Sequence, residues 1–101
     1  MRPALLLIDF INTLDFDGGE DLVPRAVAAA RHTRKLKRQA RAEGIPAIYV
    51  NDHFGDWSTN FDAVVRRCER SRLGRELASL LRPMRGDRSV LKPPHSAFYA
   101  T

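Results

Sequence analysis

Two charged residues stand directly after short strand-like segments that lie far apart in the sequence. Asp9 follows the apolar run at residues 4–8, and Lys92 follows a run at residues 88–91. A buried charge is costly unless an opposite charge pairs with it, so we expect the Asp9 carboxylate and the Lys92 ammonium to lie together. Such a pair has two possible roles. It either only neutralises both charges, or it activates a nucleophile, for which a cysteine thiol is well suited.

The first half of the chain has the pattern of a strand, a long helix and a second strand. Residues 4–8 and 45–50 are short apolar runs, and we expect the first to be buried on both faces. Residues 22–43 lack glycine, contain Pro24 near the start and are followed by Gly44, which is typical of a helix. The expected apolar stripe of this helix consists of Ala26, Ala29, Ala30, Thr33, Leu36 and Ala40. This order predicts a βαβ unit with parallel strands.

The second half predicts short helices at residues 61–69 and 74–81 and a third strand at residues 88–91. In an open parallel sheet, ligands bind beyond the carboxyl ends of the strands. Here these ends carry Asp9, residues 51–53 and Lys92. Such a small sheet with short helices has a thin core, so we expect the chain to be part of a larger protein or to need a partner.

Three segments resemble the isochorismatase-like cysteine hydrolases. They read LLLIDFINTL near the start, AIYVNDHFGDW in the middle and DRSVLKPPHSAFYAT at the end. The resemblance implies a three-layer, Rossmann-type α/β sandwich, in which helices cover both faces of a parallel sheet. It also implies that residues 1–101 are the N-terminal portion of a single domain of this kind, about half of it.

The family uses an Asp-Lys-Cys triad, and the resemblance assigns the general base to Asp9 and the lysine to Lys92. The family's cysteine lies in a later segment that resembles G-x-x-T-x-x-C, which would come after Thr101. Cys68 precedes the lysine and lies on a predicted helix, so we interpret it as a structural or surface residue. We therefore expect the completed protein to be a cysteine hydrolase and the 101 residues by themselves to be inactive.

The implied reaction is hydrolysis of an amide (C–N) bond in a small-molecule substrate. Some members of the family, the isochorismatases, instead cleave a vinyl ether without needing the cysteine, and the sequence leaves the two chemistries open. The candidate substrate-binding residues are Asn12, Trp57, His95 and Phe98. The alternative role of Asn12 is that of a turn cap. The alternative role of Trp57 and Phe98 is packing, which we favour for both residues.

Two alternatives to a hydrolase remain. One is a catalytically inactive fragment that acts by binding a partner, which rests on the absent nucleophile. The other is a basic nucleic-acid-binding module, because the net charge is +5 and the long predicted helix is rich in arginine. Aromatic residues do not alternate with the basic ones, so solvated helix faces explain the arginines better, and nucleic acid is not the expected partner.

Cofactors, compartment and assembly complete the expectations. No cofactor is predicted, and no metal, because Asp52 and His53 are adjacent whereas the zinc-binding nicotinamidases of this family use Asp-x-His. Cys68 has no second cysteine with which to form an internal disulfide, which favours the cytoplasm. No apolar run approaches the roughly 18 residues that a membrane span needs. A half-covered sheet predicts a homo-oligomer.

Overall fold

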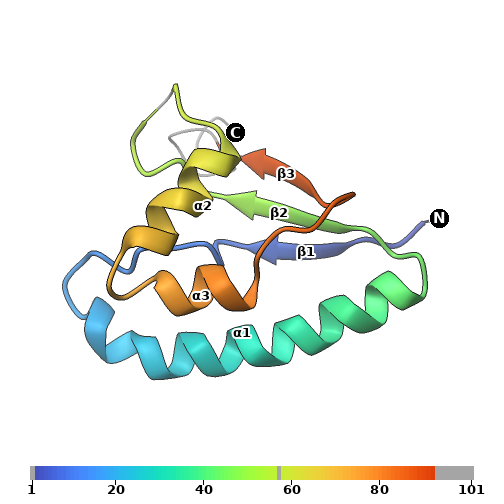
Figure 1. The fold of residues 1–101 in the computed structure, drawn as a ribbon, viewed down its shortest axis with the longest axis horizontal. Helices are drawn as coiled ribbons and strands as arrows, with labels where there is room; N and C mark the ends of the chain where they lie inside the picture. Colours follow the sequence, from blue (N-terminus) through green and yellow to red (C-terminus); the bar gives the residue numbers. More distant parts are fainter. Residues whose placement is uncertain (1, 57, 93–101) are drawn as a thin grey trace, which may run out of the picture.

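The computed structural model describes residues 2–56 and 58–92 (Figure 1). Within these residues, three parallel strands form one sheet in the order β1-β2-β3. The strands are β1 (Leu5–Ile8), β2 (Ala47–Asn51) and β3 (Arg88–Leu91). The α/β class and the parallel sheet predicted from the sequence are confirmed. Because all three strands run the same way, their carboxyl ends meet at one edge of the sheet.

Three helices follow the strands within the described residues. They are α1 (Gly19–Ala42), α2 (Phe61–Arg70) and α3 (Arg75–Leu80). Helix α1 begins three residues before the predicted start, so Pro24 lies deeper inside the helix than expected. Helix α2 begins where predicted because Asn60 caps it: the Asn60 side chain accepts a hydrogen bond from the Ala63 N–H at 2.9 Å. None of these helices is long and apolar enough to cross a bilayer.

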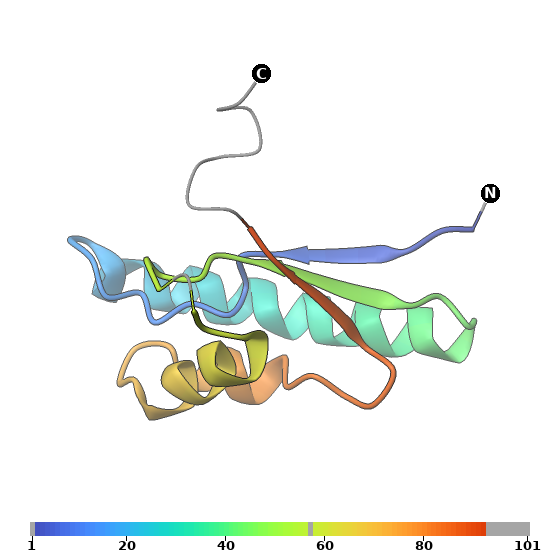
Figure 2. The same ribbon diagram turned by 90° about the horizontal axis from the view of Figure 1, so that it is seen from above.

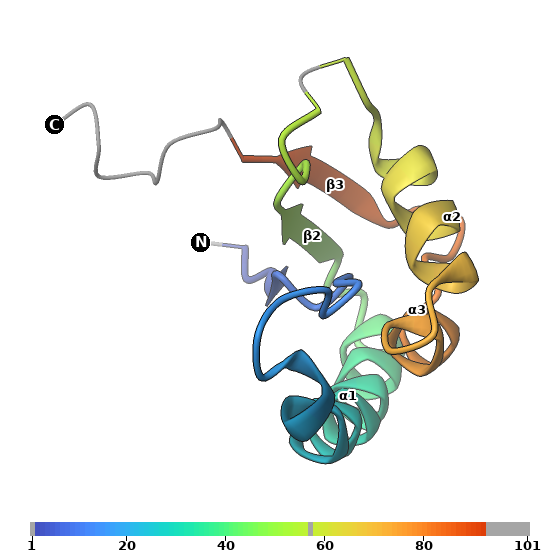
Figure 3. The same ribbon diagram turned by 90° about the vertical axis from the view of Figure 1, so that its left-hand side faces the viewer.

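The described helices lie against one face of the sheet. Figure 3, which looks along the strands, shows α1, α2 and α3 on the same side, and Figure 2 agrees. The core between the sheet and the helices is built from alternate strand residues such as Leu7 and Tyr49. These two residues are partners in the sheet register and are fully buried. Side chains from α2 and α3 complete it, including Val64, Leu77 and Ala78.

The opposite face of the sheet has no helix over it within the described residues. Leu6 and Ile8 of β1 are exposed on this face, and so is Val90 of β3. The expectation that residues 4–8 are buried on both faces is therefore wrong for this structure. The run is apolar on both faces, but burial of a strand also requires a second layer, and the described residues supply one layer.

The buried stripe of α1 differs from the predicted one. Ala30 and Ala40 are buried as expected, but Ala29 and Leu36 are exposed, and Val27 and Lys37 take buried positions instead. The 3.6-residue period allows several buried stripes that share Ala30. The stripe predicted from hydrophobicity is not the one that is buried. Lys37 is tolerated inside because a buried acid faces it.

That acid is Asp87, which lies just before β3. The Lys37 Nζ is 2.6 Å from the Asp87 Oδ2, and the two side chains are only 9% and 7% exposed. The same ammonium donates to the Tyr49 hydroxyl at 2.8 Å, and that hydroxyl donates to the Leu81 carbonyl oxygen at 2.8 Å. This buried network ties α1 to β2 and to the segment between α3 and β3.

Candidate active site

Asp9 lies at the point where the chain leaves β1. Its N–H still donates to the Val50 carbonyl oxygen at 2.8 Å, so the residue is held beside β2. Its φ is 58°, in the left-handed region that most side chains avoid. Aspartate tolerates this region better than bulky residues do, and strained backbone of this kind is concentrated at functional sites. The turn takes the chain out of the sheet directly after the carboxylate.

The Asp9 carboxylate and the Lys92 ammonium form the ion pair that the sequence predicts. The Lys92 Nζ lies 2.5 Å from the Asp9 Oδ2. The other oxygen, Oδ1, accepts a hydrogen bond from the Asp52 N–H at 3.1 Å. Each carboxylate oxygen therefore has a partner, and this fixes the orientation of the group. The Lys92 backbone is held too, since its N–H donates to the Asn51 carbonyl oxygen at 2.8 Å.

The ion pair is neither fully buried nor fully exposed. The side chain of Asp9 is 38% exposed and that of Lys92 is 31% exposed. Surface ion pairs of this exposure contribute little to stability, whereas a partly open pair can still be reached by a third group. The arrangement is chemically able to accept a proton at the carboxylate and to stabilise an anion at the ammonium.

Asn51 is the last residue of β2, and no role was predicted for it from the sequence. It is 1% exposed, and its side chain makes two hydrogen bonds to the backbone of Ile11. The Oδ1 accepts from the Ile11 N–H at 3.2 Å, and the Nδ2 donates to the Ile11 carbonyl oxygen at 2.8 Å. Asn51 thus joins the end of β2 to the segment that follows Asp9. The strand alternation of Ala47, Tyr49 and Asn51 was the available signal, because it points a polar side chain inward.

Asn12 forms a local turn and lies near Asp9, and its role in substrate binding stays a prediction. Its Oδ1 accepts a hydrogen bond from the Leu14 N–H at 2.8 Å, which is a local turn. It also lines a cavity of 340 Å³ together with Asp9 and Phe10. Gly74 holds this segment closely, since a Cβ at Gly74 would lie 2.2 Å from the Asn12 carbonyl oxygen. Asn12 therefore both caps a turn and lies beside the candidate base.

The other residues considered from the sequence lie either outside the described residues or in the loop after β2. Trp57, His95 and Phe98 lie outside the described residues, and their predicted roles stay predictions. Asp52 and His53 support their own loop: the Asp52 Oδ1 accepts from the Phe54 N–H at 3.2 Å, and the His53 Nδ1 accepts from the Gly55 N–H at 3.0 Å. Within residues 2–56 and 58–92, no three acidic, cysteine or histidine side chains are grouped as metal ligands.

Cys68 is a core residue of α2. It is fully buried among apolar side chains. Burial raises the pKa of its thiol to about 12, and the nearby Arg67 offsets this only in part. The thiol is therefore protonated at neutral pH and lacks the thiolate character of a nucleophile. Of the two interpretations made from the sequence, the structural one is confirmed.

The described residues form an α/β protein, a parallel sheet with helices packed on it. Asp9 and Lys92 meet at the carboxyl ends of its strands, the place where open α/β sheets bind their ligands. The family model described as Isochorismatase domain matches residues 3–101. The uncharacterized isochorismatase family protein YaaI of Bacillus subtilis (strain 168) is 37% identical over 98 residues. The chain therefore belongs to the isochorismatase family.

The match to YaaI covers 97% of this chain but 54% of the relative. The chain thus spans about half the length of the curated relative that it matches. No solved structure shows a significant match.

Proposed function

We propose that the protein is an isochorismatase-family hydrolase in which Asp9 is the general base and Lys92 its cationic partner, acting with a cysteine from a segment that follows Thr101. The observation that supports this proposal most directly is the 2.5 Å contact between the Lys92 Nζ and the Asp9 Oδ2 at the carboxyl edge of the sheet. Its substrate is a small molecule with an amide bond.

Each group has a defined chemical task in this reaction. The Asp9 carboxylate takes the proton from the cysteine thiol, and the Lys92 ammonium stabilises the resulting thiolate. The thiolate forms a bond to the amide carbon, the C–N bond breaks, and Asp9 gives its proton to the departing nitrogen. Water then attacks the thioester, with Asp9 accepting its proton and returning one to the sulfur. The product is a carboxylic acid, and the enzyme is restored.

The proposal requires a nucleophile other than Cys68, whose thiol is buried and protonated. We propose that residues 1–101 are the N-terminal portion of a single α/β domain and that the remainder supplies the cysteine. Two observations support this. The chain aligns with 54% of its relative, and apolar side chains of β1 and β3, such as Leu6, Ile8 and Val90, are exposed on the face without helices.

The test is turnover by the complete protein on a panel of small amides and on a vinyl ether. We expect Asp9→Asn and Lys92→Met each to lower kcat/KM by about 10²–10⁴-fold, the range in which general acid–base groups contribute. Asp17→Asn and Lys35→Met are matched controls, because both residues are exposed and lie outside the site. Unchanged turnover in Asp9→Asn would contradict the assigned role.

The same panel separates the alternatives. Loss of amide turnover when a cysteine beyond Thr101 is replaced by serine supports the thiol mechanism. Vinyl-ether turnover that survives this replacement supports the second chemistry instead. A folded complete protein that turns over no compound in either class would favour a catalytically inactive binding protein.

A further inference from the structure

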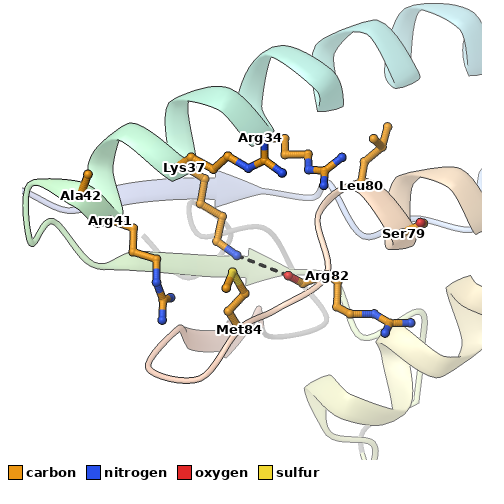
Figure 4. Close-up of a pocket in the computed structure, with 9 residues that line it drawn as sticks. Arg34, Lys37, Arg41, Ala42, Ser79, Leu80, Arg82 and Met84 are labelled. Carbon is orange, nitrogen blue, oxygen red and sulfur yellow. Dashed lines mark hydrogen bonds between the residues drawn. The ribbon is translucent and has the colours of Figure 1, made fainter.

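A second hollow lies on the helical side of the sheet, away from Asp9 and Lys92. Its volume is 590 Å³, and it lies between α1 and the segment that joins α3 to β3. Figure 4 shows Arg34, Lys37 and Arg41 extending from α1, with Arg82 and Met84 coming from the joining segment. Its lining includes Ala42 at the end of α1 and Lys37, which pairs with Asp87 just before β3. The hollow therefore lies toward the amino ends of β2 and β3, whereas the candidate active site is at their carboxyl ends.

The lining of this hollow is strongly basic. We call it the arginine pocket, after Arg34, Arg38, Arg41 and Arg82. Arg41 is near Asp87, with 4.0 Å between its Nη1 and the Asp87 Oδ1, and Arg82 lies 3.5 Å from Glu69. Among the described residues, Arg34 and Arg38 form no ion pair. Together with Lys37, five positive charges therefore face two negative ones.

Structural roles account for part of this set. The Lys37 ammonium is committed to Asp87 and Tyr49 inside the protein. Arg41 lies in the last turn of α1, where a cation offsets the helix dipole, and its Nη2 donates to the Arg85 carbonyl oxygen at 3.2 Å. Arg34 and Arg38 lie earlier in the helix, so neither the dipole nor an acidic partner in the described residues explains them.

We propose that the arginine pocket binds a small phosphorylated molecule. Guanidinium groups present paired N–H donors that match phosphate oxygens, and Arg34 and Arg38 have these donors available. Leu80 and Met84 add apolar surface for the organic part of such a molecule. The volume lies within the roughly 300–1,000 Å³ of small-molecule sites. Binding here is separate from the candidate active site and does not depend on hydrolase activity.

Calorimetric titration of the purified complete protein tests this proposal. The probes are adenosine diphosphate, pyrophosphate and inorganic phosphate at 50 mM and 200 mM salt. We expect adenosine diphosphate or pyrophosphate to bind, and the double variant Arg34→Gln/Arg38→Gln to weaken binding at least tenfold. Stronger binding of the nucleotide indicates an organic phosphate as the ligand, and equal binding of pyrophosphate indicates the anion as the recognised group.

The control is the double variant Arg66→Gln/Arg75→Gln, which also removes two positive charges, but from exposed positions outside the pocket. We expect it to bind like the unaltered protein. An equal loss of affinity in both double variants would mean general electrostatic attraction. That result, or no binding of any probe at millimolar concentration, would overturn the proposal. Circular dichroism of each variant verifies that it folds.

Discussion

Replacement of Lys37 by methionine should destabilise the protein more than any surface charge replacement, because it leaves the Asp87 carboxylate buried without its ammonium. The two atoms that pair are 2.6 Å apart, and both side chains are more than nine-tenths buried. Removal of one partner from a buried ion pair costs about 3–5 kcal/mol. Methionine has nearly the length of lysine, so the cavity contribution is small.

The remaining contacts of Asp87 place the cost near the lower end of that range. Its Oδ2 also accepts a hydrogen bond from the Met84 N–H at 2.7 Å, and Arg41 lies 4.0 Å from its Oδ1. These contacts partly stabilise the carboxylate when the ammonium is gone. We therefore expect a loss of about 3 kcal/mol in the free energy of unfolding, a large fraction of the roughly 5–15 kcal/mol of a typical domain.

The assay is equilibrium unfolding in urea, in which a loss of this size lowers the midpoint by about 1 M or more. The control is Arg31→Met, because Arg31 pairs with Glu76 at 3.0 Å on the surface, where such pairs contribute about 0–1 kcal/mol. The double variant Lys37→Met/Asp87→Asn should recover much of the loss, since no buried charge remains. If Lys37→Met cost no more than Arg31→Met, the reasoning about the buried pair would be refuted.

Three further predictions concern Cys68, Tyr49 and Asn51. The Cys68 thiol should not react with a disulfide reagent at pH 8 until the protein unfolds, because its pKa is raised to about 12; reaction at the rate of a free thiol would contradict this. Burial, and then the Asp87 carboxylate, also raise the pKa of Tyr49 above its ordinary value of 10.0. Cys68 and Tyr49 therefore keep their protons in the folded state above about pH 9, where the unfolded state loses them. Their contribution to the stability measured in urea should be constant below that pH and should fall as the pH rises toward 12, by up to about 1.4 kcal/mol per pH unit and proton; a flat profile to pH 11 would be the contrary result. Asn51→Leu removes both hydrogen bonds to Ile11 and should lower the free energy of unfolding by about 2 kcal/mol or more. Urea unfolding measures this loss, with Asn12→Ala as the control. An equal loss in the two variants would count against the role given to Asn51.

The sequence by itself determined the order of the elements and the pairing at the edge. Short apolar runs on either side of a glycine-free segment specify a βαβ unit, because local chain geometry decides these patterns. Parallel strands must then bring their carboxyl ends to one edge. Asp9 and Lys92 therefore meet although the chain between them is long, and the 2.5 Å contact confirms the pairing.

The tertiary structure decided which of several plausible faces is buried. Lys37 rather than Leu36 enters the core because Asp87, far along the chain, arrives opposite it. Leu6 and Ile8 are exposed although they are apolar, because burial depends on whether another layer packs on them. Asn51 joins β2 to the segment after Asp9 because the backbone of Ile11 comes within hydrogen-bonding distance of its side chain. Each of these outcomes depends on contacts between segments distant in sequence, which no local pattern contains.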